Sequence, residues 1–121
     1  LQKVRNKRRE FIICGNWHLA HTAADVQDTE RNSNAPGFLT SERQWMNELL
    51  ESGYVDAFRE VNSDQDEFSW WPEGDRDSNG WRSDFHIISK GLQYTVDYGA
   101  IYKSKVFSTH APVIMDYDIE L

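Results

Sequence analysis

The sequence Trp81-Arg82-Ser83-Asp84-Phe85-His86-Ile87-Ile88-Ser89 is the stretch that best defines the fold. The apolar side chains of Trp81, Phe85 and Ile87 share one parity, and polar side chains alternate with them over the first seven positions. Alternation with a period of two predicts a β-strand that buries one face and leaves polar groups on the other. The stretch before it, 72–80, is rich in Pro, Gly, Asp and Ser, which indicates a turn.

Further strands are predicted on both sides of this one. Phe11–Cys14 is a continuous apolar run that ends at Gly15, which is typical of a buried strand. In Val113–Leu121, apolar residues alternate with a largely acidic set. The full set of additional strand candidates is Phe11–Cys14, Phe68–Trp71, Val96–Tyr102 and Val113–Leu121.

One amphipathic helix is predicted between Ser41 and Gly53. Ser41 is a suitable N-cap with Gln44 three positions later, and Gly53 is suitable for the C-terminal turn. The apolar face of this helix consists of Trp45, Met46, Leu49 and Leu50. The polar segment 22–36 indicates a long loop with one helical turn. Several strands with at least one helix predict an α/β fold of the α+β type.

Length and composition limit the class of protein. A chain of 121 residues provides one hydrophobic core and little material for a second domain. No apolar run approaches the roughly 18 residues that span a bilayer, so a membrane protein is not expected. The chain starts at Leu1 without a methionine and has no signal-like segment, and we expect it to be a fragment of a cytoplasmic protein.

The single cysteine also favours a cytoplasmic protein. Cys14 has no partner within the chain, whereas small secreted domains usually carry several disulfides. Its apolar surroundings predict a buried, unreactive thiol. One cysteine and four scattered histidines also exclude a zinc finger, and we expect no resident metal in this chain.

The net charge of −7 conceals an uneven distribution. Five of the thirteen basic residues fall in the first nine positions, and four of these form the candidate basic patch: Arg5, Lys7, Arg8 and Arg9. The other 112 residues carry 8 basic and 20 acidic side chains, so an extended duplex-binding surface is not expected. The patch is a candidate contact for a nucleic acid or an acidic partner, and the alternative is a solvated helix face.

Polar side chains cluster where predicted strands end. Asn16 and His18 follow the first strand, Asp84 lies within the central alternation, and the sequence Ser108-Thr109-His110 precedes the last strand. A carboxylate such as Asp84 that accepts the ring N–H of His110 would fix the tautomer of the imidazole. The alternative is that these are two unrelated polar residues.

Several motifs, in this order, resemble the C-terminal half of the exonuclease III class of the endonuclease/exonuclease/phosphatase superfamily. They are Cys14-Gly15-Asn16-Trp17-His18-Leu19-Ala20-His21, Pro36-Gly37-Phe38-Leu39, Glu42-Arg43-x-Trp45, Gly53-Tyr54-x-Asp56-Ala57-Phe58-Arg59, Phe68-Ser69-Trp70-Trp71, Gly80-Trp81-Arg82-x-Asp84 and Ser108-x-His110-Ala111-Pro112-Val113.

This resemblance implies half of a four-layer α/β sandwich of the DNase I-like type. Residues 1–121 would be the C-terminal half of that domain, with one mixed β-sheet covered by helices on one face. The inner face of such a sheet is apolar. We therefore expect either the absent N-terminal half or a second copy of the chain to pack on it.

The resemblance also implies site residues. The family motif Gly-Asp-x-Asn matches this chain with Asn16 in place of the acid and His18 in place of the amide, and Thr109 replaces the acid of a Ser-Asp-His motif. His110 and Asp84 match the retained histidine and its orienting carboxylate. The remaining implied residues are the pocket-lining or nucleic-acid candidates Trp70, Trp81 and Arg82, although both tryptophans and Trp71 are alternatively core residues.

These replacements change the chemistry that is expected. A neutral Asn16 cannot accept a proton, and Thr109 removes a carboxylate from the Mg²⁺ site that the resemblance implies. The catabolite repression control branch of the family has lost the same acids. It implies a catalytically inactive post-transcriptional regulator that acts with an Sm-like RNA chaperone on A-rich mRNA.

The alternative is an active enzyme. It would be a Mg²⁺-dependent exodeoxyribonuclease III or abasic-site endonuclease acting on DNA. Asp84 or the absent half would then supply the missing carboxylate.

Overall fold

The strand predicted around Phe85 lies at the centre of a three-stranded antiparallel sheet. In the computed structural model, which describes residues 10–64, 66–106 and 108–119, β3 (Asp84–Ser89) pairs with β1 (Ile12–Asn16) and β2 (Tyr54–Asp56). The other elements are η1 (Ala23–Asp25), α2 (Thr40–Glu51), α3 (Ala57–Val61), η2 (Lys90–Thr95), β4 (Val96–Ile101) and β5 (Val113–Tyr117).

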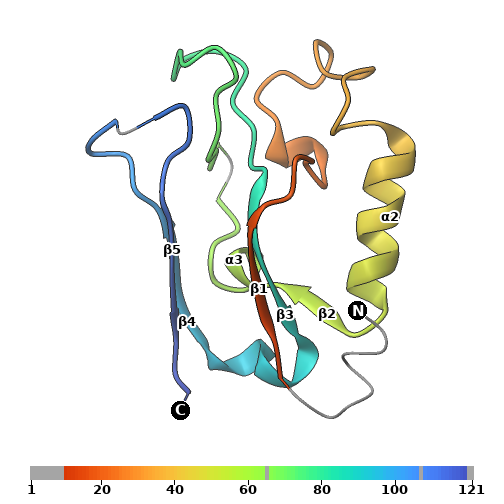
Figure 1. Ribbon diagram of the computed structural model, residues 1–121, viewed down its shortest axis with the longest axis vertical. Helices are drawn as coiled ribbons and strands as arrows, with labels where there is room; N and C mark the ends of the chain where they lie inside the picture. Colours follow the sequence, from red (N-terminus) through yellow and green to blue (C-terminus); the bar gives the residue numbers. More distant parts are fainter. Residues whose placement is uncertain (1–9, 65, 107, 120–121) are drawn as a thin grey trace.

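β4 and β5 form a separate, two-stranded antiparallel sheet. Figure 1 shows this sheet on one side of the molecule, the β1–β3–β2 sheet in the middle and α2 on the far side. Ile88 of β3 shares an apolar cluster with Val96 of β4 and with Met115 and Tyr117 of β5, so the two sheets pack face to face. The α/β class is therefore confirmed, but the single mixed sheet that we expected is two antiparallel sheets.

The other face of the central sheet is covered by α2. Met46 and Leu49 of this helix pack with Phe85 and Ile87 of β3 in one buried cluster, as the apolar spacing predicted. Trp45 is 47% exposed and lies at the margin of that face. No helix in the described ranges is long and apolar enough to cross a membrane.

The ends of α2 confirm one prediction and correct another. Gly53 has φ 111°, in the left-handed region, and so ends the helix as expected. The N-cap is Leu39 rather than Ser41. The Glu42 carboxylate accepts hydrogen bonds from the backbone N–H groups of Gly37 (2.7 Å) and Leu39 (3.2 Å), and this replaces the predicted hydroxyl cap.

Two predicted strands differ from expectation. Among the described residues, β1 pairs with β3 alone and is an edge strand. Its residues Ile12 and Cys14 are exposed, so it is not the buried strand that its apolar sequence indicated. Segment 68–71 is not a strand, because Trp70 makes only isolated bridges with Trp81 and His110. The segment 22–36 is a loop with one helical turn, η1, as predicted.

A buried ion-pair network joins three segments of the chain. Arg82, which precedes β3, donates from Nε to Oδ1 of Asp25 at 2.8 Å and from one terminal nitrogen to Oδ2 of Asp56 at 2.5 Å. Arg59 of α3 also binds Asp25, at 2.9 Å. Burial alone would raise the pKa of Asp25, but the charge of Arg82 and the hydrogen bonds from both arginines lower it to about 2.

We predict that Arg82→Met destabilises the protein by about 3–5 kcal/mol, because it leaves the carboxylates of Asp25 and Asp56 buried without their partner. Urea unfolding of the variant measures this loss. The control is Arg31→Met, which removes a half-exposed ion pair with Glu73 and should cost less than about 1 kcal/mol. Equal losses in the two variants would contradict the assigned role of Arg82.

The lowered pKa of Asp25 also predicts how stability depends on pH. Because the pKa is lower in the folded state (about 2) than the ordinary value of 3.8, its contribution is complete above about pH 4 and is lost as the pH falls towards 2. The shift corresponds to roughly 2 kcal/mol. Unfolding free energies measured from pH 5 to pH 2 should therefore fall less steeply in Asp25→Asn than in Glu48→Gln, a surface control.

Candidate functional site

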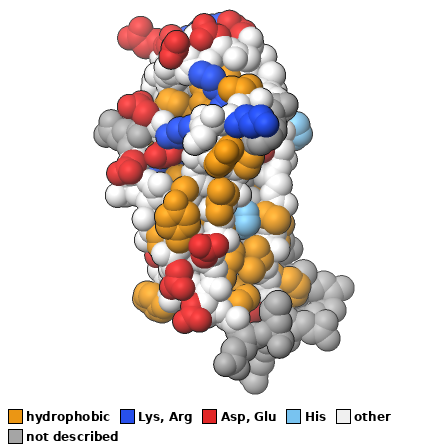
Figure 2. Space-filling model, turned by 90° about the vertical axis from the view of Figure 1, so that its left-hand side faces the viewer, with side chains coloured by type: hydrophobic (Ala, Val, Ile, Leu, Met, Phe, Trp, Pro, Cys, Tyr) orange, Lys and Arg blue, Asp and Glu red, His pale blue; other side chains and the backbone are white. Residues whose placement is uncertain are grey.

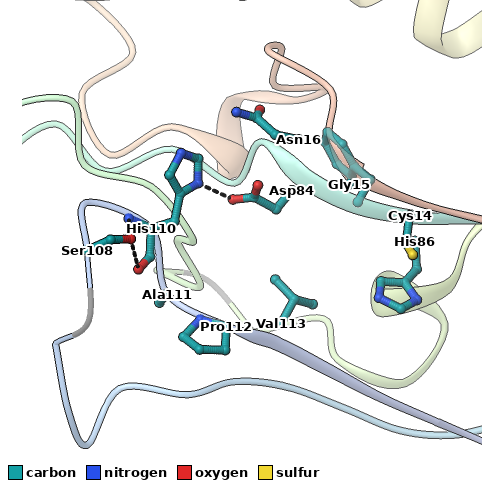
Figure 3. A pocket seen from close by; sticks show the side chains of 11 residues that line it. Cys14, Gly15, Asn16, Asp84, His86, Ser108, His110, Ala111, Pro112 and Val113 are labelled. Atoms are coloured by element: carbon teal, nitrogen blue, oxygen red, sulfur yellow. Dashed lines mark hydrogen bonds and ion pairs between the residues drawn. The ribbon is translucent and has the colours of Figure 1, made fainter.

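An open groove of about 430 Å³ lies where the two sheets meet. Its walls are contributed by the end of β1, the start of β3 and the segment that leads into β5. Figure 3 shows Asn16, Asp84 and His110 together at one end of the groove, and Cys14 and His86 at the other. The lining residues are Cys14, Gly15, Asn16, Asp84, Phe85, His86, Ser108, His110, Ala111, Pro112 and Val113.

The pairing of β1 with β3 brings Asn16 and Asp84 together. The two residues are opposite each other in the antiparallel register, so their side chains share one face of the sheet. The Asn16 side-chain oxygen accepts a hydrogen bond from the backbone N–H of His18 at 2.9 Å. That contact holds the turn in which His18 has φ 56° and uses one lone pair of this amide oxygen, which carries no negative charge to offer to a cation.

The predicted pair of Asp84 and His110 is present. Nδ1 of His110 lies 2.8 Å from Oδ2 of Asp84, and the side chains are 33% and 19% exposed. With the Nδ1–H donated to the carboxylate, Nε2 is the imidazole nitrogen left to contact a ligand. The pair can therefore orient Nε2 toward a ligand, as an acceptor in neutral imidazole and as a donor to an anionic oxygen in imidazolium.

Trp70 supports the other side of this histidine. Its indole ring stacks on the imidazole of His110 with ring centroids 5.8 Å apart and an interplanar angle of 20°. Its edge also contacts Trp81 in a T-shaped arrangement at 5.7 Å. The imidazole is therefore fixed by a hydrogen bond at one edge and by a ring stack on one face.

Trp81 and Arg82 do not line the groove, which corrects the expectation for both. Trp81 is 4% exposed and packs with Phe38 and Val26, and Arg82 is 1% exposed in the ion-pair network. Trp71 is buried as well, as the alternative reading of the tryptophans expected.

The remaining predicted site residues lie elsewhere. His18 and Thr109 are exposed and are not among the lining residues of the groove. The basic patch of Arg5, Lys7, Arg8 and Arg9 falls outside the described residues.

The far end of the groove contains residues that sequence reasoning did not assign to a site. His86 lies opposite Cys14 across β1 and β3 and contacts the hydroxyl of Tyr117 through Nδ1 at 3.0 Å. Burial lowers the pKa of His86 and raises that of Tyr117 to about 12. Cys14 is exposed here rather than buried. His86 and Asp84 are two residues apart, so they point to the same face of a strand, and this pattern could have placed His86 in the groove.

The donor atoms of the groove do not fit a resident Mg²⁺. This cation prefers several carboxylate oxygens, and Asp84, the one acidic lining residue, is engaged by His110. Among the described residues there is no group of three His, Cys, Asp or Glu side chains that could hold a metal.

Comparison with curated proteins identifies the relatives of the chain. It is 35% identical over 112 residues to an exodeoxyribonuclease of Bacillus subtilis and 32% identical over 124 residues to a DNA-(apurinic or apyrimidinic site) endonuclease of Dictyostelium discoideum. The homologues of this chain are exodeoxyribonucleases and AP endonucleases. The matches cover 89% and 98% of the chain but only 44% and 34% of these proteins. No protein-family profile matches the chain.

Solved structures of the same class share the fold. An AP endonuclease from Archaeoglobus fulgidus matches with a TM-score of 0.86 at 21% identity, over 98% of the chain and 49% of that protein. The 3′ phosphatase NExo from Neisseria, solved with a product DNA hairpin, matches with a TM-score of 0.85 at 23% identity and the same coverage. The DNase I-like fold is therefore confirmed, and the chain spans less than half the length of each relative named here.

If the full-length protein binds a phosphodiester at His110, Trp70→Leu should weaken that binding about two- to tenfold, because a ring stack of this kind contributes about 0.5–1.5 kcal/mol to holding His110. Binding of a short oligonucleotide by the full-length protein, followed with the NMR signals of the His110 ring, measures the effect. Trp70→Phe keeps an aromatic face and should retain most of the affinity. Identical behaviour of the two variants would show that the stack does not position His110.

Proposed function

We propose that this chain is the C-terminal half of an exonuclease III-like protein that binds a phosphodiester strand but does not hydrolyse it. The observation that carries the proposal is the state of Asn16. This neutral amide stands beside Asp84 at the position where the resembling family has an acid, and its oxygen accepts the His18 N–H.

The chemistry of the groove supports binding over catalysis. An amide cannot take a proton from water at neutral pH, and loss of a general base typically lowers a rate by about 10²–10⁴. In its imidazolium form, with Nδ1–H on Asp84, His110 can donate Nε2–H to a phosphate oxygen. The same end of the groove therefore retains a phosphate contact while it lacks a base.

The finer role that we propose is post-transcriptional regulation. The replacements at Asn16, His18 and Thr109 match the catabolite repression control branch of the resembling family. That match suggests a cytoplasmic regulator that acts with an Sm-like RNA chaperone on A-rich mRNA. The acidic balance of −7 supports a role in which a partner supplies much of the RNA affinity.

An active nuclease is the second candidate, and the intact pair of Asp84 and His110 favours it. Several relatives carry the names of exodeoxyribonucleases and AP endonucleases. In this case the half of the protein outside the chain would supply the missing carboxylates, and Mg²⁺ would polarise the phosphate when bound.

Cleavage of an abasic-site duplex by the full-length protein in Mg²⁺ distinguishes the two candidates. We expect no cleavage by the native protein, and a gain of at least about 10²-fold over background in the triple variant Asn16→Asp, His18→Asn, Thr109→Asp, which restores the family acids and amide. The control is the same triple variant with His110→Ala, which should lose the gain. Cleavage by the native protein that disappears in His110→Ala would establish the nuclease instead.

A further inference from the structure

A second cavity, of about 250 Å³, lies beside the segment that carries His110. We call it the Trp71 cavity, and none of its lining residues lines the groove. It touches the backbone of that segment at two points, where the Trp71 N–H donates to the carbonyl of Thr109 at 2.9 Å and Arg76 donates to the carbonyl of Ser108 at 3.1 Å. Its lining residues are Gln27, Asp66, Phe68, Trp71, Arg76, Lys103 and Val106.

The cavity has an apolar floor that carries a flat cation. Phe68 and Trp71 are 5% and 4% exposed, and the Arg76 guanidinium carbon lies 4.0 Å from the centroid of the Trp71 ring. The hydrogen bond to Ser108 holds this planar group in place. A guanidinium fixed on an indole is preorganised to stack a second planar group on its other face.

The polar groups of the lining residues are committed or buried. Gln27 binds Gly80 and Asp77, and Lys103 pairs at 3.0 Å with Glu67. Nε1 of Trp71 and Nε of Arg76 have no hydrogen-bond partner among the described residues, but both atoms are buried and closed to a ligand as the side chains stand. The cavity therefore offers a ligand the face of the Arg76 guanidinium, which suits a planar group.

The surrounding charge is compatible with a phosphate-linked ligand. Lys103 is half exposed, and Val106, at the rim, is 64% exposed. Figure 2 shows lysine and arginine side chains grouped towards the upper end of the face that carries β4 and β5, beside hydrophobic side chains. Asp66 is the acidic lining residue and can accept a hydrogen bond from an amino group on the edge of a base.

We propose that the Trp71 cavity holds one nucleobase of a single strand whose phosphodiester is bound at His110. This inference rests on the proposed function, because it adds a base contact next to the phosphate contact. A cavity of about 250 Å³ is smaller than the roughly 300–1,000 Å³ of ordinary small-molecule sites, and it fits a single planar group rather than a whole dinucleotide. The base stacks on the face of the Arg76 guanidinium that is turned away from Trp71.

The test is binding of short single-stranded oligonucleotides to the full-length protein, with one abasic position moved along the strand. We expect one position at which removal of the base weakens binding about fivefold or more, the effect of losing one stacked base. Arg76→Lys keeps the charge but loses the planar fork, and it should abolish that position dependence. Lys90→Ala, which removes an exposed cation at the start of η2, should leave the dependence unchanged.

Three outcomes overturn the proposal. Equal affinity for every abasic position would show that no base is held, and position dependence that survives in Arg76→Lys would place the base elsewhere. If a free mononucleotide binds as tightly as the strand, and its binding also depends on Arg76, the cavity is a nucleotide pocket instead.

The NMR signals of the His110 ring separate this proposal from the proposed function. If a fully abasic strand shifts these signals but no position dependence exists, only the nucleobase site fails. If no strand shifts them or binds, the proposed function and the nucleobase site fail together.

Discussion

The ion-pair network around Arg82 is the constraint on which the rest of the structure depends. It connects η1, the end of β2 and the residue two positions before β3, three segments that are far apart in the sequence. Both carboxylates are buried, so the arrangement is stable only with the guanidinium in place. Because Asp84 follows Arg82 by two residues, the position of the site carboxylate is set by this buried charge cluster.

The site is assembled where the two sheets meet. β1 and β3 bring Asn16 opposite Asp84, and the segment before β5 brings His110 from the second sheet to within 2.8 Å of Asp84. Trp70 completes the support of the imidazole by stacking on it. The result is a fixed histidine beside a neutral amide, which suits the recognition of a phosphate better than the activation of water.

Local patterns predicted much of this architecture. The alternation around Phe85 predicted β3, and the spacing of Met46 and Leu49 predicted the buried face of α2. The apolar run Phe11–Cys14 predicted a buried thiol, but Cys14 is exposed, on a strand that lies at the edge of its sheet. The alternation placed Arg82 on the polar face of its strand, but the residue is buried. Its compensating partners Asp25 and Asp56 are distant in the sequence, so no local pattern predicts this. The division of the strands between two sheets is a long-range property that no local period encodes.

In the function that we propose, the groove of this nuclease fold keeps a phosphate contact at His110 and lacks a general base at Asn16. The most direct single measurement is an NMR titration of the full-length protein, labelled at histidine, with an abasic-site strand in Mg²⁺, in which the integrity of the strand is followed in the same sample. The account predicts that the His110 ring signals shift while the strand stays intact. A strand that is cut, or His110 signals that do not move, would contradict it.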